Sequence, residues 1–438
     1  MADIRGFRAY RYNLAQAGAL ADVVAPPYDV IDSALQDQLY NNSPFNVIRL
    51  ILDRELPSDT ESNNRYSRSA AFLRDWLAND ILQRDSAPAL YVYEQVYEVE
   101  GRKHVRKGFL ARVRLEPFGQ GRIYPHEETL SGPKADRLKL FRATGMNLSP
   151  VFGLYPDPHC EVMAKLEKPI GQLPPLEATD HLGTISRMWV VTDHSIVSTV
   201  TGMMGPKPVF IADGHHRYET GLKYLEEKTA AGEAPNSDSP PNFILMMLVS
   251  MSDPGLLILP THRLVSGLPG LTCEQLQQSL GSHFQLEKTG IGDAGAREAW
   301  EMIEADGGQN LLGFGTRADG IWQVGRLTQP QAMDQLAEQR SPAWRSLGVS
   351  ILHVLGIDHL LKASPGFTPA PSCKYVHLLG EVTEAMQKGA CDLGVLVPPA
   401  EMDHVEEIAG NLEKMPSKST YFYPKLLSGM LFNSLKNS

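Results

Sequence analysis

The chain has 438 residues, 42% of them hydrophobic and 21% charged, with a formal net charge of −10. The chain is longer than those that usually fold around a single hydrophobic core, so more than one domain is expected. Its composition is that of a folded globular protein. The negative charge argues against a general nucleic-acid or membrane-surface binder, because both surfaces demand a basic face, although a local basic pocket is still allowed. No apolar run is long enough to span a bilayer and no signal peptide is recognisable, so we expect a cytoplasmic protein.

The first half of the chain predicts helices and strands in alternation. Segments rich in β-branched and aromatic residues indicate strands, and apolar stripes with a helical period indicate helices. A hairpin is expected to turn at Glu100-Gly101, and Gly145 is expected to end a helix. The expected helices are 33–40, 67–80, 134–144 and 218–228, and the expected strands are 46–52, 89–100, 107–115, 151–155, 188–192 and 209–212.

The second half begins after an exposed loop at 232–241. Two buried strands, 243–250 and 256–259, are expected to be joined by a turn at Asp253-Pro254-Gly255. Further on we expect helices at 273–280, 350–362, 382–388 and 400–412, a hairpin turning at 318–320, and a strand at 392–397. The pattern predicts an α/β (α+β mixed) fold in three regions, 1–160, 161–270 and 271–438.

The central motif is a polar break after a buried strand, Asp213-Gly214-His215-His216-Arg217. A strand that ends in Asp-Gly before a helix points backbone N–H groups outward, and the helix dipole adds positive potential. Gly214 permits a close backbone approach, and Arg217 can clamp an anion. Asp213 either caps the helix or acts as an acid, a base or a metal ligand, and at most one of the two histidines is expected to face the ligand.

A second polar stretch precedes the helix at 134–144. His126, Glu127 and Glu128 can bind a metal or move protons, and the alternative is an exposed, solvated loop. Ser131 and Gly132 offer a turn before the helix, whose Lys134 and Arg137 share a face and suit an anionic ligand.

Three shorter segments complete the candidate residues. His262 and Arg263 follow a buried strand and suit phosphate binding, with a capped loop as the alternative. Lys418 and Lys425 can add phosphate contacts, or they belong to a surface tail. Tyr28 and Asp29 follow a rigid pair of prolines. The histidines are dispersed and no spacing enforces a metal site, so the metal stays unknown.

These motifs together resemble a bacterial and archaeal family of proteins of unknown function, DUF1015. The resemblance covers most of the chain and rests on five segments in the same order. They are Ala25–Val30, His126–Arg137, Ala212–Tyr218, Leu259–Arg263 and Lys418–Lys425.

The Asp-Gly-His-His-Arg segment is similar to the phosphate-binding motif of the ParB/sulfiredoxin-like superfamily. That superfamily includes nucleotide-dependent free-serine kinases, sulfiredoxins and CTP-binding chromosome-partition proteins. The resemblance implies a ParB/sulfiredoxin-like core with additional α/β subdomains, in which Gly214, His215, His216 and Arg217 hold nucleotide phosphates and Asp213 lies near the transferred group or its Mg²⁺. Sulfiredoxin chemistry needs a Cys within the motif, and this stretch has none.

Three functions follow as hypotheses. The first is a phosphotransferase that uses ADP or ATP with Mg²⁺ on a small hydroxyl metabolite such as free serine. The second is a phosphomonoesterase, for example on phosphoserine, that uses the same anion site. The third is a nucleotide-binding regulatory protein without turnover. The expected partner is a small anionic substrate or nucleotide, with no nucleic acid and no membrane, and a homodimer is the default oligomer.

Overall fold

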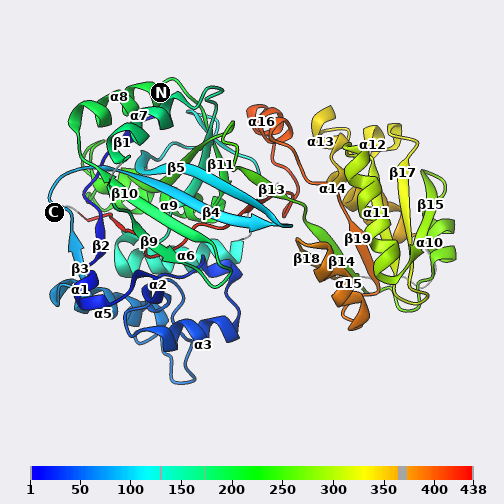
Figure 1. Cartoon of the computed structure of the whole chain (residues 1–438), viewed down its shortest axis with the longest axis horizontal. Coiled ribbons are helices and arrows are strands. Elements are labelled where there is room, and N and C mark those ends of the chain that lie inside the picture. Colours follow the sequence, from blue (N-terminus) through cyan, green and yellow to red (C-terminus); the bar gives the residue numbers. More distant parts are fainter. Residues whose placement is uncertain (1, 129–130, 172, 364–371, 437–438) are drawn as a thin grey trace. The chain divides into compact units, whose positions relative to one another are not determined.

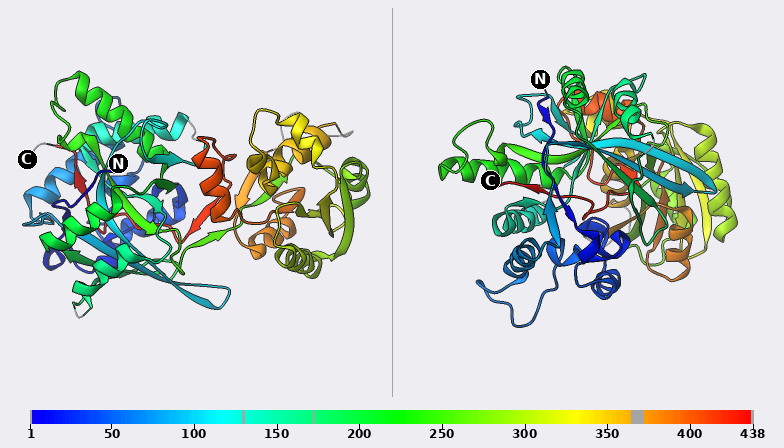
Figure 2. Two further views of the ribbon diagram at one scale, coloured as in Figure 1. Left: turned by 90° about the horizontal axis from the view of Figure 1, so that it is seen from above. Right: turned by 60° about the vertical axis from the view of Figure 1, so that its left-hand side comes forward.

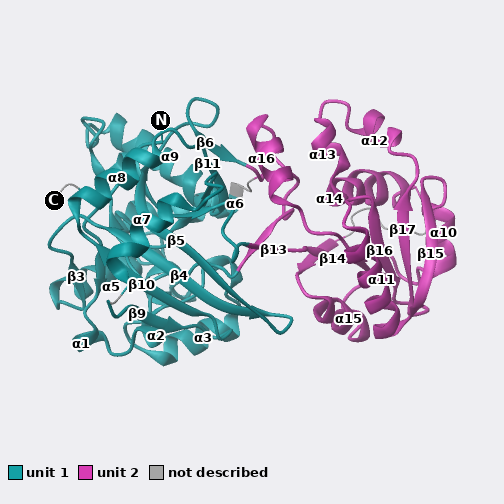
Figure 3. Cartoon of the chain, turned by 45° about the horizontal axis from the view of Figure 1, so that its top comes forward, with its two compact units in different colours: residues 1–125, 129–256, 424–438 teal, residues 126–128, 257–423 magenta. Residues whose placement is uncertain are grey.

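The computed structural model describes residues 2–128, 131–171, 173–363 and 372–436. The chain divides into two compact units with mixed α/β structure (Figure 3). Unit 1 comprises 1–125, 129–256 and 424–438, and unit 2 comprises 126–128 and 257–423. The boundaries predicted after residues 160 and 270 are not those of the units, because the chain leaves unit 1 after Leu256 and returns to it at Pro424.

A nine-stranded sheet forms the centre of unit 1 in the described chain (Figure 1). Its strands run in the order β6 (Ile123–Pro125), β11 (Val209–Asp213), β8 (Val151–Tyr155), β12 (Phe243–Ser250), β5 (Arg102–Arg114), β4 (Leu90–Val99), β10 (Ile185–Val191) and β9 (Leu176–Thr179), with β1 (Ile4–Arg5) paired to β5. The β6–β11 and β8–β12 pairs are parallel, whereas the other pairs are antiparallel. The strands expected at 151–155 and 243–250 are confirmed with those bounds.

The long hairpin of β4 and β5 can be followed in Figure 2 and turns at Glu100-Gly101, as expected. Its residues alternate between two buried faces. Val92 belongs to the core that α7 (Glu161–Ile170), α8 (His194–Met204) and α9 (His215–Ala230) help to form. Tyr93 points the other way and lines a small cavity with Leu426 and Leu431. Each face of the sheet is therefore covered.

The segment expected as a strand at 46–52 is instead helical, as α4 (Ile48–Ile51). The side chain of Asn46 decides this, because its Oδ1 accepts from the backbone N–H of Ile48 at 2.9 Å. Its Nδ2 donates to the carbonyls of Asp22 and Val24 at 2.7 and 3.0 Å. The β-branched residues of the segment are buried within a short helix, and this local side-chain hydrogen bond outweighs their strand propensity.

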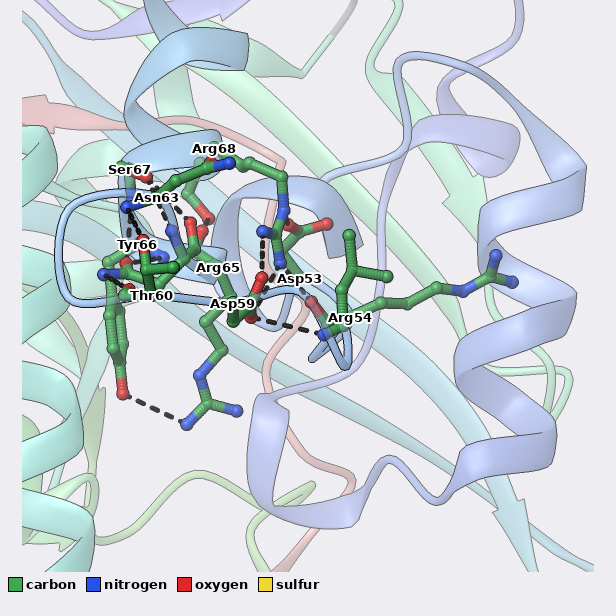
Figure 4. A network of polar contacts seen from close by, with 12 residues as sticks. Asp53, Arg54, Asp59, Thr60, Asn63, Arg65, Tyr66, Ser67 and Arg68 are labelled. Atoms are coloured by element: carbon green, nitrogen blue, oxygen red, sulfur yellow. Dashed lines mark hydrogen bonds and ion pairs between the residues drawn. The ribbon is translucent and has the colours of Figure 1, made fainter.

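A polar network fixes α5 (Arg65–Ala78) at its start, as Figure 4 shows. Arg68 donates to Asp53 at 2.8 Å and to Asp59 at 2.5 Å. Arg65 pairs with Asp136 of α6 (Ser131–Thr144) at 2.5 Å, which ties the two helices together.

The remaining elements of unit 1 are α1 (Leu14–Ala17), α2 (Leu20–Val23), η1 (Tyr28–Val30), α3 (Ser33–Asn42), η2 (Pro240–Asn242), and the strand pairs β2 (Tyr10–Tyr12) with β3 (Leu82–Arg84) and β7 (Met146–Asn147) with β21 (Asn433–Ser434).

Unit 2 is built on a six-stranded antiparallel sheet in the described chain. Its order is β15 (Phe284–Ile291), β17 (Ile321–Leu327), β16 (Leu311–Thr316), β19 (Leu393–Leu396), β14 (His262–Ser266) and β18 (Ser372–Val376). One apolar cluster joins the sheet to α10 (Cys273–Leu280), α12 (Gln331–Leu336), α13 (Pro342–Ser346), α14 (Gly348–Ser350), the π-helix η3 (Ile351–Leu361) and α16 (Met402–Gly410). A second cluster joins it to α11 (Gly292–Asp306) and α15 (Leu379–Gln387).

The strands expected at 243–250 and 256–259 do not pair with each other. The second, β13 (Leu257–Leu259), belongs to unit 2 and pairs with β20 (Tyr421–Tyr423). The turn at Asp253-Pro254-Gly255 therefore precedes the passage from one unit to the other. Across the ranges that the structure describes, no helix combines the length and apolar character needed to cross a membrane.

Candidate functional site

The central motif forms a tight strand-to-helix turn in unit 1. β11 ends at Asp213 and α9 begins at His215, one turn earlier than the start expected at 218. Gly214 lies between them with φ 88°, in the left-handed region. A Cβ at this position would lie 2.9 Å from Nε of Arg217, so the turn needs glycine for both its backbone angle and its space.

Asp213 is held between two cations. Arg217 donates to Oδ2 at 2.6 Å, and Lys425 donates to Oδ1. Arg217 is buried and also donates to the carbonyl of Pro150. Burial raises the pKa of the Asp213 carboxyl, but Lys425, Arg217 and His215 outweigh that effect and hold it well below its usual range. Asp213 is therefore an anchored, ionised carboxylate at the start of α9.

The two histidines of the motif have different surroundings. His215 is 7% exposed, whereas His216 is half-buried. The backbone carbonyl of His216 accepts from the hydroxyl of Thr220 at 2.6 Å, within the first turn of α9. The expectation that one histidine faces a ligand stays a prediction.

Tyr28 and Arg137 meet in unit 1. The guanidinium of Arg137 lies 4.0 Å from the centre of the Tyr28 ring. Arg137 is buried and donates to the carbonyl of Ile51 at 2.8 Å and to Asp136 at 2.7 Å, so it holds helices together in this arrangement. Burial raises the pKa of Tyr28 to about 12. The negative charges of Asp29 and Asp213 also raise this pKa, whereas the positive charges of Arg137 and Arg217 lower it.

The stretch before α6 differs from the expected turn. α6 starts at Ser131, three residues before the helix expected from Lys134, so Gly132 lies exposed in its first turn. Thr129 and Leu130 and the side chain of Ser131 lie outside the described residues. Lys134 donates to Glu219 of α9 at 2.9 Å. It therefore links α6 to the helix that follows the Asp213 turn.

A second group of expected residues gathers in unit 2, around the backbone of Lys418. Glu127 accepts from the N–H of Lys418 at 2.8 Å, and Arg263 donates to its carbonyl at 2.9 Å. Lys418 has φ 60°, a left-handed conformation that these two contacts hold. Nearby, Nε2 of His126 and Oγ1 of Thr420 are 2.7 Å apart. Three motifs far apart in the sequence thus build one loop.

The other members of this group also contact backbone groups or neighbouring side chains. Arg263 is fully buried and also donates to the carbonyl of Thr261 and, at 3.2 Å, to Nε2 of His353. His262 is buried too, and its Nδ1 accepts from the N–H of Val397 at 3.2 Å. Burial lowers the pKa of His262 to about 3, so it stays neutral. Glu128 is exposed and lies 3.4 Å from Arg340.

One pair of buried residues was not expected from the sequence. Arg106 of β5 donates to the carbonyl of Pro424 at 2.5 Å, and Gln95 of β4 donates to the carbonyl of Lys425 at 3.1 Å. Arg106 also lies 4.7 Å from the ring of Phe152. The pair holds the backbone that presents Lys425 to Asp213. Period-two alternation along β5 places Arg106 on a buried face, which is the signal that could have identified it.

The described residues contain no group of three or more His, Cys, Asp and Glu side chains that could hold a metal ion. In unit 1 both carboxylate oxygens of Asp213 receive cationic donors. Mg²⁺ would compete with Lys425 and Arg217 for these oxygens. Asp213 in this arrangement therefore does not fit a resident metal ligand.

Several solved structures are remotely similar to this chain. A free serine kinase in complex with AMP is 13% identical, with a TM-score of 0.35, over 69% of this chain and 83% of that one. A conserved hypothetical protein from Pyrococcus furiosus is 14% identical, with a TM-score of 0.34, over 70% and 89%. SbnI with a C-terminal truncation from Staphylococcus aureus is 11% identical, with a TM-score of 0.33, over 73% and 85%. At these TM-scores no functional argument follows from the likenesses.

No curated protein matches the chain. One family model does match, over residues 4–350, and it is described as "Protein of unknown function (DUF1015)". The match spans well over half of the sequence and includes the Asp213 turn and the segments around His126 and Arg263. The chain belongs to the DUF1015 family.

Proposed function

We propose that the turn at Asp213 binds the phosphates of a nucleotide, ADP or ATP, and that the protein transfers a phosphoryl group to a small hydroxyl metabolite such as free serine. The observation that carries this proposal is the charge around Asp213. One carboxylate contacts two cations, Arg217 and Lys425, so the group has an excess of one positive charge. It lies at the N-terminus of the 16-residue helix α9, which adds positive potential.

An anionic ligand would change the ion pairs that Lys425 and Arg217 form with Asp213. Without ligand, Lys425 and Arg217 neutralise Asp213. A phosphate chain at the start of α9 would compete for the same donors, because phosphate oxygens accept charge-assisted hydrogen bonds as a carboxylate does. Arg217 is also anchored to the carbonyl of Pro150 and is expected to stay, and we propose that Lys425 moves toward the phosphates.

Release of Lys425 would leave Asp213 able to accept a proton. In the proposed step, the acceptor hydroxyl loses its proton to Asp213 and its oxygen forms a bond to the terminal phosphorus. The bond from phosphorus to the bridging oxygen breaks, and the shortened nucleotide leaves with that electron pair. Positioning and charge neutralisation supply most of the catalysis in such transfers.

The other predicted roles are part of this proposal. His215 and His216 are proposed to contact phosphate or substrate at the start of α9, and Lys134 to add positive charge from α6. Mg²⁺ would enter with the nucleotide phosphates, because the oxygens of Asp213 are engaged. Roles for His126, Glu127 and Glu128 in proton transfer remain proposals, as does a cytoplasmic homodimer.

The test is phosphorus NMR on the full chain with ATP or ADP and Mg²⁺, with and without L-serine. The proposal expects a new phosphomonoester signal and nucleotide consumption only with serine or another hydroxyl acceptor present. Release of phosphate from phosphoserine without nucleotide would replace the kinase with a phosphomonoesterase. A rise in melting temperature with nucleotide, without turnover of any acceptor tested, would replace it with a regulatory nucleotide-binding protein.

Variants test whether the site is the one proposed. Arg217→Ala and Lys425→Ala are expected to weaken nucleotide binding about 10- to 100-fold, the cost of one charged hydrogen bond. Lys223→Ala is the matched control, because this exposed lysine of α9 pairs only with Glu226 in the described contacts. Full binding and turnover in both Arg217→Ala and Lys425→Ala would exclude the Asp213 turn as the site.

A further inference from the structure

A second cavity of unit 1, away from the Asp213 turn, combines an apolar wall with a basic rim. Its volume is about 240 Å³. Leu73 and Leu77 of α5 and Met146 of β7 form apolar parts of the wall. Arg74 of α5, Arg84 of β3 and Lys436 also line it. None of the described residues that line the cavity is acidic.

The three cations differ from their neighbours on α5, because no ion pair with another described residue is found for them. On the same helix α5, Arg65 pairs with Asp136, and Arg68 pairs with Asp53 and Asp59. Within the described chain, no ion pair engages Arg74, Arg84 or Lys436. Uncompensated positive charge next to apolar surface favours an anionic ligand.

Two contacts show how these side chains are placed. The stem of Lys436 crosses Gly145, where an added Cβ would lie 2.4 Å from Cε of the lysine. The guanidinium of Arg84 lies 5.9 Å from the centre of the Tyr10 ring. Gly145 follows the last residue of α6 and has φ 63°, so a larger residue there would meet both strain and the lysine stem.

The dipole of α6 explains the position of only one of the three cations. Lys436 lies by the carbonyl end of α6, where a cation is favoured. Arg74 and Arg84 come from α5 and β3, so the end of α6 does not explain them. The polar network at the start of α5 (Figure 4) fixes the helix that carries Arg74 and the two leucines.

We propose that this cavity binds a small organic anion. Its phosphate or carboxylate head would contact Arg74, Arg84 and Lys436, and a short apolar part would lie against Leu73 and Leu77. The site is separate from the proposed nucleotide site, because Lys134 and Thr144 lie at opposite ends of α6, about 15 Å apart by helical rise. The inference does not depend on the proposed function.

The experiment uses the full chain and isothermal titration calorimetry with four probes. They are hexyl phosphate, hexanoate, inorganic phosphate and hexanol. We expect the anions with an apolar chain to bind at least about 10-fold more tightly than hexanol or inorganic phosphate, since they use both the rim and the wall. Tighter binding of hexyl phosphate would assign a phosphate head, and tighter binding of hexanoate a carboxylate head.

The variants Arg74→Gln and Arg84→Gln are expected to weaken binding of the tighter probe about 10-fold each, the lower end of the cost of a charged hydrogen bond. Both arginines are exposed, so the fold should tolerate the change. Arg102→Gln, in the exposed turn region of β5, is the matched control and should bind as the parent does. Arg217→Ala should also leave this binding unchanged. Equal binding of anions and hexanol, or no effect of Arg74→Gln and Arg84→Gln, would overturn the proposal.

Discussion

Nζ of Lys425 donates to Oδ1 of Asp213 across 212 residues of sequence. The backbone of the segment that carries Lys425 accepts hydrogen bonds from Arg106 and Gln95. The carboxylate at the start of α9 therefore depends on a residue that the chain supplies after the whole of unit 2.

Removal of this lysine is expected to raise the pKa of Asp213 and to destabilise unit 1. Lys425→Met removes one of two cations from a largely buried carboxylate, at a cost of about 1–3 kcal/mol in the free energy of unfolding. Because the pKa of Asp213 is lower in the folded chain than in the unfolded one, its stabilising effect is present above about pH 4 and is lost as the pH falls below that value. Urea unfolding from pH 2 to 7 should show a weaker acid dependence for Lys425→Met, and Lys223→Met should behave as the parent. An acid dependence unchanged by Lys425→Met would contradict the ion pair.

Glycine at position 214 is expected to be required for more than its backbone angle. Gly214→Ala places a Cβ 2.9 Å from Arg217 Nε, whereas Gly232, with φ 72°, faces open space. Strain in the left-handed region costs each alanine variant about 1 kcal/mol, and the contact with Arg217 adds a further cost for Gly214→Ala alone. Chemical denaturation measures both variants against the parent. Equal losses at the two positions would show that Arg217 moves away at no cost.

Asp253 is expected to titrate near neutral pH. Burial raises its pKa to about 6, although its carboxylate accepts from the N–H groups of Gly255 and Lys107 at 2.9 and 3.4 Å. A raised folded-state pKa in an acid means that its contribution to stability is most favourable below about pH 4 and is lost as the pH rises through 6. The stability of the parent relative to Asp253→Asn should fall over that interval. Carbon NMR of the carboxyl group measures the pKa, and a value near 4 would refute this assignment.

Arg263 is expected to be essential for the stability of unit 2. Arg263→Met removes donors from the carbonyls of Thr261 and Lys418 and from His353. The buried carbonyl of Thr261 left without its donor costs about 1–3 kcal/mol, and loss of the part-buried bonds to Lys418 and His353 adds to it, so a loss of about 3 kcal/mol in total is expected from urea unfolding. Arg297→Met, at an exposed position of α11, is the control. A loss below 1 kcal/mol for Arg263→Met would show that another donor replaces the guanidinium.

Regular elements with a strong local pattern could be predicted from the sequence. The eight apolar residues at 243–250 form β12, and the helix at 273–280 is confirmed with those bounds because a capping box starts it at Thr272. The strand at 46–52 was wrong, since Oδ1 of Asn46 accepts from Ile48 at the start of a short helix. Its Nδ2 donates to the carbonyls of Asp22 and Val24. The π-helical winding of η3 has no signal in its apolar sequence.

The candidate site also has a local part that could be predicted from the sequence and distant contacts that could not. The turn from Asp213 to Arg217 is local, so its glycine and its helix start follow from adjacent residues. The partners of Asp213 and Lys418 are not local: Lys425 and Arg263 reach them across 212 and 155 residues. The sequence also does not indicate that Glu127 belongs to unit 2 and the nearby Lys134 to unit 1. These pairings depend on how the chain passes between the units.

The return of the chain to unit 1 also sets an order for its synthesis. Residues 257–423 leave the ribosome before Lys425 and the leucines that lie against Tyr93. Unit 1 therefore lacks the leucines beside Tyr93, and Asp213 lacks one of its two cations, until the last residues are synthesised. A chain that ends shortly before residue 424 would lack these leucines and the Lys425–Asp213 ion pair permanently.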